Sequence, residues 1–165
     1  MNFMGYSRPD GKAGIRNKVL ILPTCVCSSE TCRIVADQVE GAIYTSNQAG
    51  CSEVEQNLKI CYDMYSGFAA NPNIYGTVLI GLGCEGCTPD KMADAIREKT
   101  NKPLAVVVIQ DEGGTVNAIN KAVKYAREFV QEASLVQKEE IPLSELFIGL
   151  ECGGSDATSG LAANP

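Results

Sequence analysis

Five short segments of the chain hold the residues that could do chemistry. Three of them pair cysteine with glycine, and two place a carboxylate beside the cysteine. Glycine lets a backbone approach a ligand closely, and thiolate with carboxylate suits iron or another transition metal. Histidine is absent, so acid–base chemistry must use thiolate, carboxylate, lysine, tyrosine or backbone groups. The segments are 25–29, 47–51, 83–87, 110–114 and 151–156.

Each of these segments follows a predicted strand. Short apolar runs alternate with stretches of helical period, and we expect strands at 18–25, 42–46, 77–82, 104–109 and 146–150. This order predicts an α/β fold with an open, mostly parallel, Rossmann-like sheet of about five strands and helices on both faces. Ligands bind at the carboxyl ends of the strands in such sheets, so we expect the five segments to share one edge.

Helical signals separate the expected strands. The pattern over 30–39 predicts one helix, and the sequence 52–55 has the form of a capping box that opens the next. Thr88 and Pro89 predict the start of a third helix, because a first turn leaves the N–H that proline lacks without a partner anyway. The continuous apolar run 104–109 is typical of a strand buried on both faces of a parallel sheet.

The eight cysteines also have plainer interpretations. Cys32 and Cys61 fall on the expected inner faces of helices, where cysteine packs as a small hydrophobe. Cys84 and Cys87 have the spacing of half a zinc site, but the chain has no second pair with that spacing. A thioredoxin-like redox role has little support, because the usual flanking tryptophan and proline are absent.

Composition narrows the classes of function. The chain has 165 residues, enough for one domain with a core, and a net charge of −6 from 14 basic and 20 acidic residues. An acidic chain is unsuited to nucleic acid or to an anionic membrane surface. No apolar run reaches the roughly 20 residues that span a bilayer, and the start has no signal core. We therefore expect a cytoplasmic protein with reduced thiols and with no nucleic-acid or membrane partner.

The segments, taken in order, resemble the altronate and galactarate dehydratase family. The stretch GYSRPDGKAGIRN at 5–17 is similar to that family's GY-R-DG--G-RN segment. That family also includes the large subunit of sulfolactate sulfo-lyase. The later blocks cover nearly the whole chain and are 25–29, 50–51, GLGCE at 81–85, QDEGGT at 110–115 and CGGSDATSG at 152–160.

The resemblance also implies domains or subunits beyond the blocks that match in this sequence. Family members have a small amino-terminal domain or a separate small subunit, and they extend well past the CGGSD block. We therefore expect an amino-terminal segment at 1–17, an α/β domain at 18–153, and a Gly/Ser-rich loop at 154–165 truncated before the rest of the parent protein. The expected partners are the remainder of the catalytic region, the small domain or subunit, and a sugar-acid substrate. A homo-oligomer is also allowed.

The activity implied by the resemblance is dehydration of a sugar acid. The α-proton leaves, the β-hydroxyl is expelled, and the product is a 2-keto-3-deoxy acid; the substrate is altronate or, second, galactarate. A divalent cation would ease both steps by holding the substrate oxygens. The family's association with iron makes Fe2+ or Mn2+ the expected cofactor, with Cys51, Cys84 and Cys152 as ligands. Carboxylate ligands and a four-iron cluster on the same cysteines stay open as alternatives.

The resemblance assigns roles to further residues. Without histidine, the base is expected among Glu85, Glu151 and Asp156, whose alternative role is to bind backbone amides at loop ends. An anionic substrate calls for a cationic clamp, expected from Arg8 and Arg16, which could instead form surface ion pairs. The other expected substrate-binding residues are Gln110, Gly113, Gly114, Thr115 and Ser155, although the two glycines could simply open a helix.

Two other functions stay open at this point. The chain could belong to the large subunit of a sulfolactate sulfo-lyase, which shares the proton abstraction but expels sulfite. It could also be a non-catalytic, thiol-rich module that binds metal or acts in redox chemistry. Metal content and cysteine reactivity would distinguish this last function from the two lyases.

Overall fold

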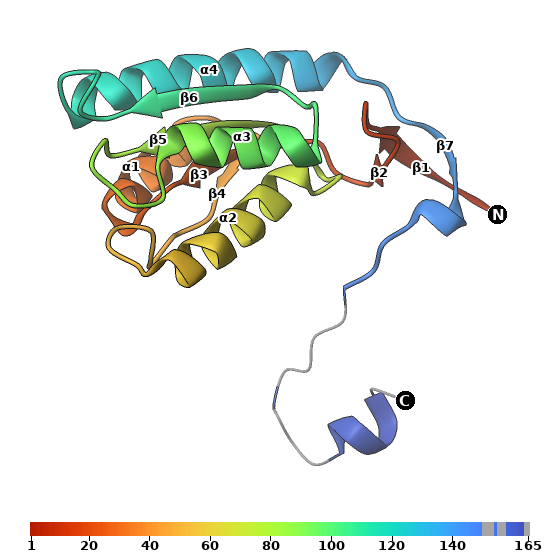
Figure 1. The fold of residues 1–165 in the computed structure, drawn as a ribbon. Coiled ribbons are helices and arrows are strands. Elements are labelled where there is room, and N and C mark those ends of the chain that lie inside the picture. The colour runs from red at the N-terminus through yellow and green to blue at the C-terminus, as the bar shows by residue number, and fades with distance from the viewer. Residues whose placement is uncertain (150–153, 155–157, 164–165) are drawn as a thin grey trace.

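The computed structural model describes residues 1–149, 154 and 158–163. Four parallel strands form its central sheet: β3 (Lys18–Pro23), β4 (Ala42–Tyr44), β5 (Ile74–Gly81) and β6 (Leu104–Val108). Their order across the sheet is β4-β3-β5-β6. In Figure 1 the carboxyl ends of these strands lie at the left of the view.

Helices cover both faces of this sheet, which confirms the predicted α/β fold. The helices are α1 (Val26–Asp37), α2 (Glu55–Ala70), α3 (Pro89–Lys99) and α4 (Thr115–Leu135). The side chains of α1 and α4 pack in one hydrophobic cluster and those of α2 and α3 in another. Figure 1 shows α3 and α2 in front of the strands.

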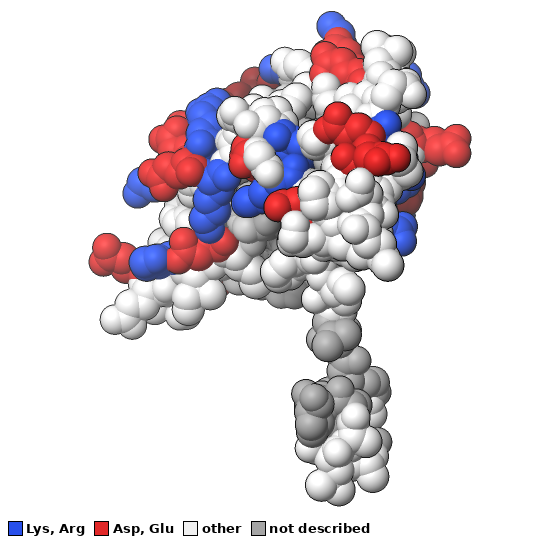
Figure 2. All heavy atoms as spheres, turned by 90° about the vertical axis from the view of Figure 1, so that its right-hand side faces the viewer, with Lys and Arg blue, Asp and Glu red and all other residues white. Residues whose placement is uncertain are grey.

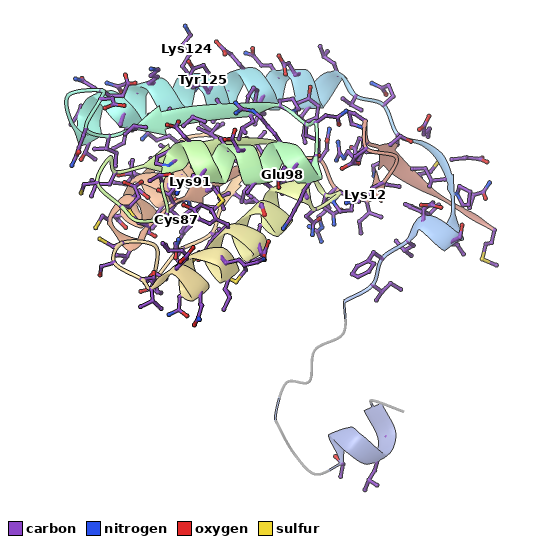
Figure 3. The ribbon with its side chains drawn as sticks, viewed as in Figure 1. Lys12, Cys87, Lys91, Glu98, Lys124 and Tyr125 are labelled. Carbon is purple, nitrogen blue, oxygen red and sulfur yellow. The ribbon has the colours of Figure 1, made fainter. Side chains whose placement is uncertain are left out.

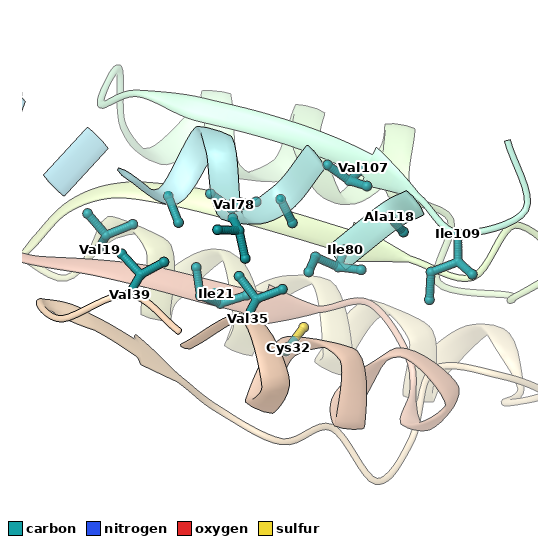
Figure 4. Packing of buried hydrophobic residues seen from close by; sticks show 13 residues of the cluster. Val19, Ile21, Cys32, Val35, Val39, Val78, Ile80, Val107, Ile109 and Ala118 are labelled. Carbon is teal, nitrogen blue, oxygen red and sulfur yellow. The ribbon is translucent and has the colours of Figure 1, made fainter. Parts of the chain in front are cut away.

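The alternation of side chains along β3 divides the core between the two faces. Val19 and Ile21 pack against α1 and α4, whereas Leu20 and Leu22 pack on the side of α2 and α3. Figure 4 shows the first cluster, with Cys32 beside Val35. Cys32 and Cys61 are both buried, as predicted for core cysteines.

The helix boundaries differ from the predictions in two places. α1 begins at Val26, four residues earlier than the predicted 30–39 helix, so its first turn contains segment 25–29. The capping box at 52–55 does not form, because Val54 is the N-cap of α2 and no side chain caps it. α3 begins at Pro89, as predicted.

The fifth strand, expected at 146–150, is not formed over residues 146–149. α4 packs beside α1 and across β5 and β3, on the opposite face from α3. A right-handed crossover to a strand outside β6 would need a helix on the α3 face instead. β6 is therefore the outer strand of the described sheet, and it is mostly half-buried rather than buried on both faces.

After α4 the chain joins a second, small antiparallel sheet that the sequence reading missed. Its order is β2-β1-β7, and Phe3 pairs with Ile141. This sheet lies at the right of Figure 1, beyond the amino ends of the parallel strands. The strands are β1 (Asn2–Ser7), β2 (Ala13–Gly14) and β7 (Glu139–Pro142).

Arg8 ties the amino-terminal segment to the main sheet. Its guanidinium donates hydrogen bonds to the Pro72 carbonyl at 2.6 Å, to Asn17 Oδ1 at 2.8 Å and to the Arg16 carbonyl at 2.8 Å. The side chain is only 6% exposed and also lies over the ring of Tyr6. All these contacts are at the amino end of the sheet, before β3 and β5 begin.

Lys102 is a second buried cation at this end, and it makes stability depend on pH. Its Nζ donates to the Asn71 carbonyl at 2.7 Å. Burial lowers the pKa of Lys102 from 10.5 to about 8, despite the opposing effect of Asp10. The unfolded chain therefore binds more protons than the folded chain between these values, and the free energy of unfolding should rise with pH there.

We expect Lys102→Met to remove this rise, which should approach about 1 kcal/mol per pH unit in the unmodified protein. Urea unfolding at pH 7, 8, 9 and 10 measures it. Lys124→Met is the matched control, because Lys124 is exposed on α4 (Figure 3) and should leave the slope unchanged. Equal slopes in both variants would contradict the prediction.

Candidate functional site

The connections of the strands define a switch point between β3 and β5. From β3 the chain moves through α1 to β4 on one side, and from β5 it moves through α3 to β6 on the other. The helices of these two crossovers lie on opposite faces of the sheet. In open α/β sheets a crevice for ligands forms at this point, outside the carboxyl ends of the two strands.

A buried carboxylate joins the two loops that flank the switch point. Glu85 Oε1 accepts a hydrogen bond from Thr24 Oγ1 at 2.5 Å and another from the Leu82 N–H at 2.8 Å. Its Oε2 accepts from the Gly83 N–H at 2.6 Å. Because Thr24 follows β3 and the other residues follow β5, Glu85 holds the two loops together.

Hydrogen bonding determines the charge state of Glu85. The side chain is 5% exposed, and this burial alone would raise its pKa. The hydrogen bonds from Thr24 and from the Gly83 and Leu82 amides outweigh burial, so the pKa lies below its ordinary value of 4.5. A carboxylate with a lowered pKa and engaged oxygens suits the positioning of a loop better than proton abstraction.

The loop after β4 packs against both of these loops. Gly50 has a φ of +91°, and a Cβ there would lie 2.2 Å from the Thr24 carbonyl oxygen, so this close approach requires glycine. The Asn47 side-chain amide donates to that same oxygen at 2.9 Å. On the other side, the Cys87 N–H donates to the Gly50 carbonyl at 2.8 Å.

The loop after β6 lies beside the loop after β5. The Gln110 N–H donates at 3.0 Å to the carbonyl that precedes Gly83, and a Cβ on Gly83 would lie 2.7 Å from Gln110 Oε1. Gly113 and Gly114 have φ of 76° and 127°, which favours glycine at both positions, and Thr115 begins α4. The prediction that the segments share one edge is confirmed for the four loops in the described part of the chain.

The cysteines of these loops fall into an exposed and a buried group. Cys27, Cys51 and Cys84 are exposed, whereas Cys25 and Cys87 are buried. Burial raises the pKa of the Cys25 thiol, and it raises the pKa of Cys87 to about 12, so both stay protonated at neutral pH. The exposed cysteines are therefore the ones available to a ligand.

Two of the expected metal ligands lie on joined loops. The Gly86 N–H, two residues after Cys84, donates to the Cys51 carbonyl at 2.9 Å. No group of three His, Cys, Asp or Glu side chains that could hold a metal occurs within residues 1–149, 154 and 158–163. Cys152, the third expected ligand, lies outside the described residues, as do Glu151, Ser155 and Asp156.

The structure does not bring Arg8 and Arg16 to this edge. Both lie at the opposite end of the sheet, where the Arg8 guanidinium is buried and engaged with Pro72, Asn17 and the Arg16 carbonyl. The Arg16 N–H donates to Asn73 Oδ1 at 3.0 Å. We therefore leave both arginines out of the proposed site, because neither can clamp a ligand at the carboxyl ends.

Two family descriptions match the sequence of this chain. The family described as "D-galactarate dehydratase/Altronate hydrolase, second domain" matches residues 5–134. The chain belongs to this dehydratase family. The companion description "D-galactarate/Altronate dehydratase, C-terminal" matches residues 143–165. Among the described residues of this dehydratase-family chain, no helix is long and apolar enough to cross a membrane.

Curated relatives include more than one lyase. The chain is 37% identical over 163 residues to "(2R)-sulfolactate sulfo-lyase subunit beta" of Chromohalobacter salexigens, covering 99% of this chain and 41% of that protein. It is 30% identical over 173 residues to "Altronate dehydratase" of Bacillus subtilis, covering 99% of this chain and 34% of that protein. A 101-residue match to "Galactarate dehydratase (L-threo-forming)" of Escherichia coli is 38% identical and covers 58% of the chain and 19% of that protein. The chain thus spans only part of these relatives, and no solved structure matches it significantly.

Three residues that organise this edge of the dehydratase-family domain were not among the predicted site residues. Thr24 and Asn47 link neighbouring loops, and Glu53 Oε2 accepts from the Gly50 N–H at 2.8 Å. Their position directly after a strand, or within a few residues of Gly50, was the available signal. Residue type alone gives none, because threonine, asparagine and glutamate are common in any surface loop.

Proposed function

We propose that the chain is part of a lyase that removes the α-proton of a hydroxy-acid anion and expels a β-substituent, with altronate or galactarate losing water. The observation that carries this proposal is the joining of four family-matching loops at the switch point of the sheet. Family membership supports the class of reaction, and the activity of the whole protein rests on parts outside this chain.

A sulfo-lyase is the second candidate, and a specific observation favours it. Identity to the sulfo-lyase subunit beta is 37%, against 30% for the Bacillus subtilis altronate dehydratase, at the same 99% coverage of the chain. Both reactions begin with loss of a proton beside a carboxylate, and they differ in whether sulfite or hydroxide leaves. A substrate panel of altronate, galactarate and sulfolactate on the parent polypeptide distinguishes them.

A divalent ion, Fe2+ or Mn2+, fits the donors of this edge in part. Cys51 and Cys84 are exposed on loops joined by a hydrogen bond, and thiolates suit iron. No group of three such donors occurs among the described residues, so the proposed site needs Cys152 or groups from the rest of the protein. When bound, such an ion stabilises the negative charge that develops on substrate oxygens.

The chain's own residues position the substrate in this proposal. The segments 24–29, 47–53, 82–88 and 110–115 contain no lysine or arginine, so an anionic group must meet backbone amides or groups from elsewhere. The start of α4 at Thr115 offers the positive end of a helix, whereas the Gly113 and Gly114 N–H groups already donate to the Gln110 and Ile109 carbonyls. Gln110 adds a side-chain amide beside Gly83.

The ionised, hydrogen-bonded state of Glu85 decides which residue is proposed as the base. Its lowered pKa and three accepted hydrogen bonds make it a residue that positions the two loops. In the proposal, proton abstraction therefore falls to Glu151 or Asp156, or to a group of the parent protein. Glu151→Gln and Asp156→Asn in the parent polypeptide test this assignment by turnover.

We expect Cys51→Ser and Cys84→Ser, each in the parent polypeptide, to lower turnover by about 100-fold or more and to lower bound iron. The melting temperature should change by only a few degrees, because both side chains are exposed. Cys27→Ser is the matched control, an exposed cysteine of the same edge with no assigned ligand role. Normal turnover and metal content in both variants would remove these cysteines from the proposed site.

A further inference from the structure

The amino end of the sheet, opposite the proposed active edge, carries a hollow with no role in the chemistry. The hollow has a volume of about 600 Å³ and is lined by Gly67, Ala70, Asn71, Pro72 and Phe147, among others. A second hollow of about 270 Å³ shares Asn71, Pro72 and Phe147 with it. We call the two together the amino-end hollow. Figure 2 faces this end of the molecule.

A glycine in the wall of this hollow has no explanation within the described residues. Gly67 lies inside α2, where glycine costs about 1 kcal/mol relative to alanine. A Cβ there would meet nothing within 4 Å, and its φ is not in the left-handed region. Neither packing nor backbone conformation in the described part of the chain therefore calls for glycine. Close approach of another surface is the remaining physical reason to keep a side chain out.

The chain itself leads along this surface. Phe147 lines both hollows yet is 90% exposed, and the next residue, Ile148, is 69% exposed. Large apolar side chains exposed side by side mark a surface that something else covers. These residues belong to the stretch 143–165 that matches the C-terminal family description.

We propose that the amino-end hollow is the docking surface for the C-terminal domain of the same polypeptide. Residues of the stretch 143–149, which belongs to the C-terminal match, already line this hollow. Two relatives match 99% of this chain, yet the chain covers only 41% and 34% of their length. These relatives therefore extend beyond the part that the chain matches. This proposal rests on family membership and is independent of the proposed reaction.

Charge defines what the docked surface must present. Lys12 and Lys99 line the hollow, and Glu145 lines it with them. Figure 3 places Lys12 at this end and Cys87 at the opposite one. The partner surface should therefore be apolar against Gly67 and Phe147, with a carboxylate toward Lys12, whose ammonium would otherwise lose water without compensation.

Hydrogen exchange tests the docking in the parent polypeptide that contains this chain. Backbone amides at 12–16 and 67–74 should exchange about tenfold or more slowly there than in the 165-residue chain, while the outer face of α4 stays equal. If the amides at 12–16 and 67–74 exchange at equal rates in the parent polypeptide and in the 165-residue chain, the proposal is overturned. Protection that appears in the 165-residue chain only at high protein concentration would also overturn it, because a second copy would then be the occupant.

A single substitution gives an independent test. Gly67→Arg adds a large charged side chain to the hollow and should not harm the fold, because arginine is a better helix former than glycine. In the parent polypeptide it should increase exchange at 12–16 about tenfold, while the melting temperature of the 165-residue chain stays equal or rises. Asn120→Arg, exposed on α4, is the matched control and should change neither. Unchanged exchange in the Gly67 variant would reject this surface as the interface.

Discussion

Replacing Arg8 by methionine is expected to lower the free energy of unfolding of the 165-residue chain by about 3 kcal/mol. The substitution removes three charge-assisted hydrogen bonds and leaves the carbonyls of Pro72 and Arg16 and the Asn17 side chain without their donor. Buried acceptors that lose a partner cost more than the net worth of the bond they made. Urea unfolding measures the effect.

A conservative variant and a control make the Arg8 result specific. Arg8→Lys should recover only part of the loss, because an ammonium cannot reach three acceptors in different directions. Arg127→Met removes an exposed arginine of α4 and should change stability little. If Arg8→Met unfolds like the unmodified chain and instead raises KM in the parent polypeptide, Arg8 acts on substrate and the structural role is wrong.

Arg8 also shows where sequence reasoning reached its limit. Its place in a family-matching segment marks it as important, but a motif does not say which end of the sheet it occupies. Its acceptor Pro72 is 64 residues away in the chain, and the small sheet beside it pairs Phe3 with Ile141, 138 residues apart. Such pairing has no local signal, because the alternation of a short edge strand is weak.

The parallel sheet was predictable for the opposite reason. β3 and β5 are continuous apolar runs buried from both faces, and each ends in a turn-forming sequence that the next helix follows. The same pattern gave a wrong prediction for the residues at 146–149, which are apolar but form no strand; α4 before them lies on the α1 face, so a right-handed crossover would lead away from β6. The hydrophobicity of a segment predicts that it is buried, but it does not predict which element of the fold buries it.

The sequence predicted the position of the loops at the carboxyl edge better than the roles of their residues. Cysteine and glycine at strand ends correctly predicted that the loop of Gly50 and Cys51 lies beside the loop of Cys84. Glu85 was expected as a base, with binding of backbone amides at a loop end as its alternative role, and the structure gives it two backbone amide donors and the Thr24 hydroxyl. A residue's chemistry depends on its hydrogen bonds, which a sequence does not list.

Glu85→Gln is expected to lower the free energy of unfolding at pH 7 by about 2–3 kcal/mol. All three groups that face the carboxylate donate to it, namely the Thr24 hydroxyl and the Leu82 and Gly83 amides. A glutamine amide nitrogen is a donor, so one orientation sets it against Gly83 and the other against Leu82 and Thr24. The two loops at the switch point should then separate, and turnover of the parent polypeptide should fall together with stability.

The pH dependence of this loss tests the ionised state of Glu85. Its folded pKa lies below the ordinary 4.5, so its contribution is fully present above that pH and disappears as pH falls through the folded value. The difference between the unmodified chain and Glu85→Gln should therefore be nearly constant from pH 5 to 7 and shrink as the pH falls below the ordinary 4.5 and through the lower folded pKa. Glu128→Gln, an exposed carboxylate of α4, should show no such difference. A Glu85→Gln chain as stable as the original, with turnover abolished, would instead make Glu85 a residue that acts on the substrate.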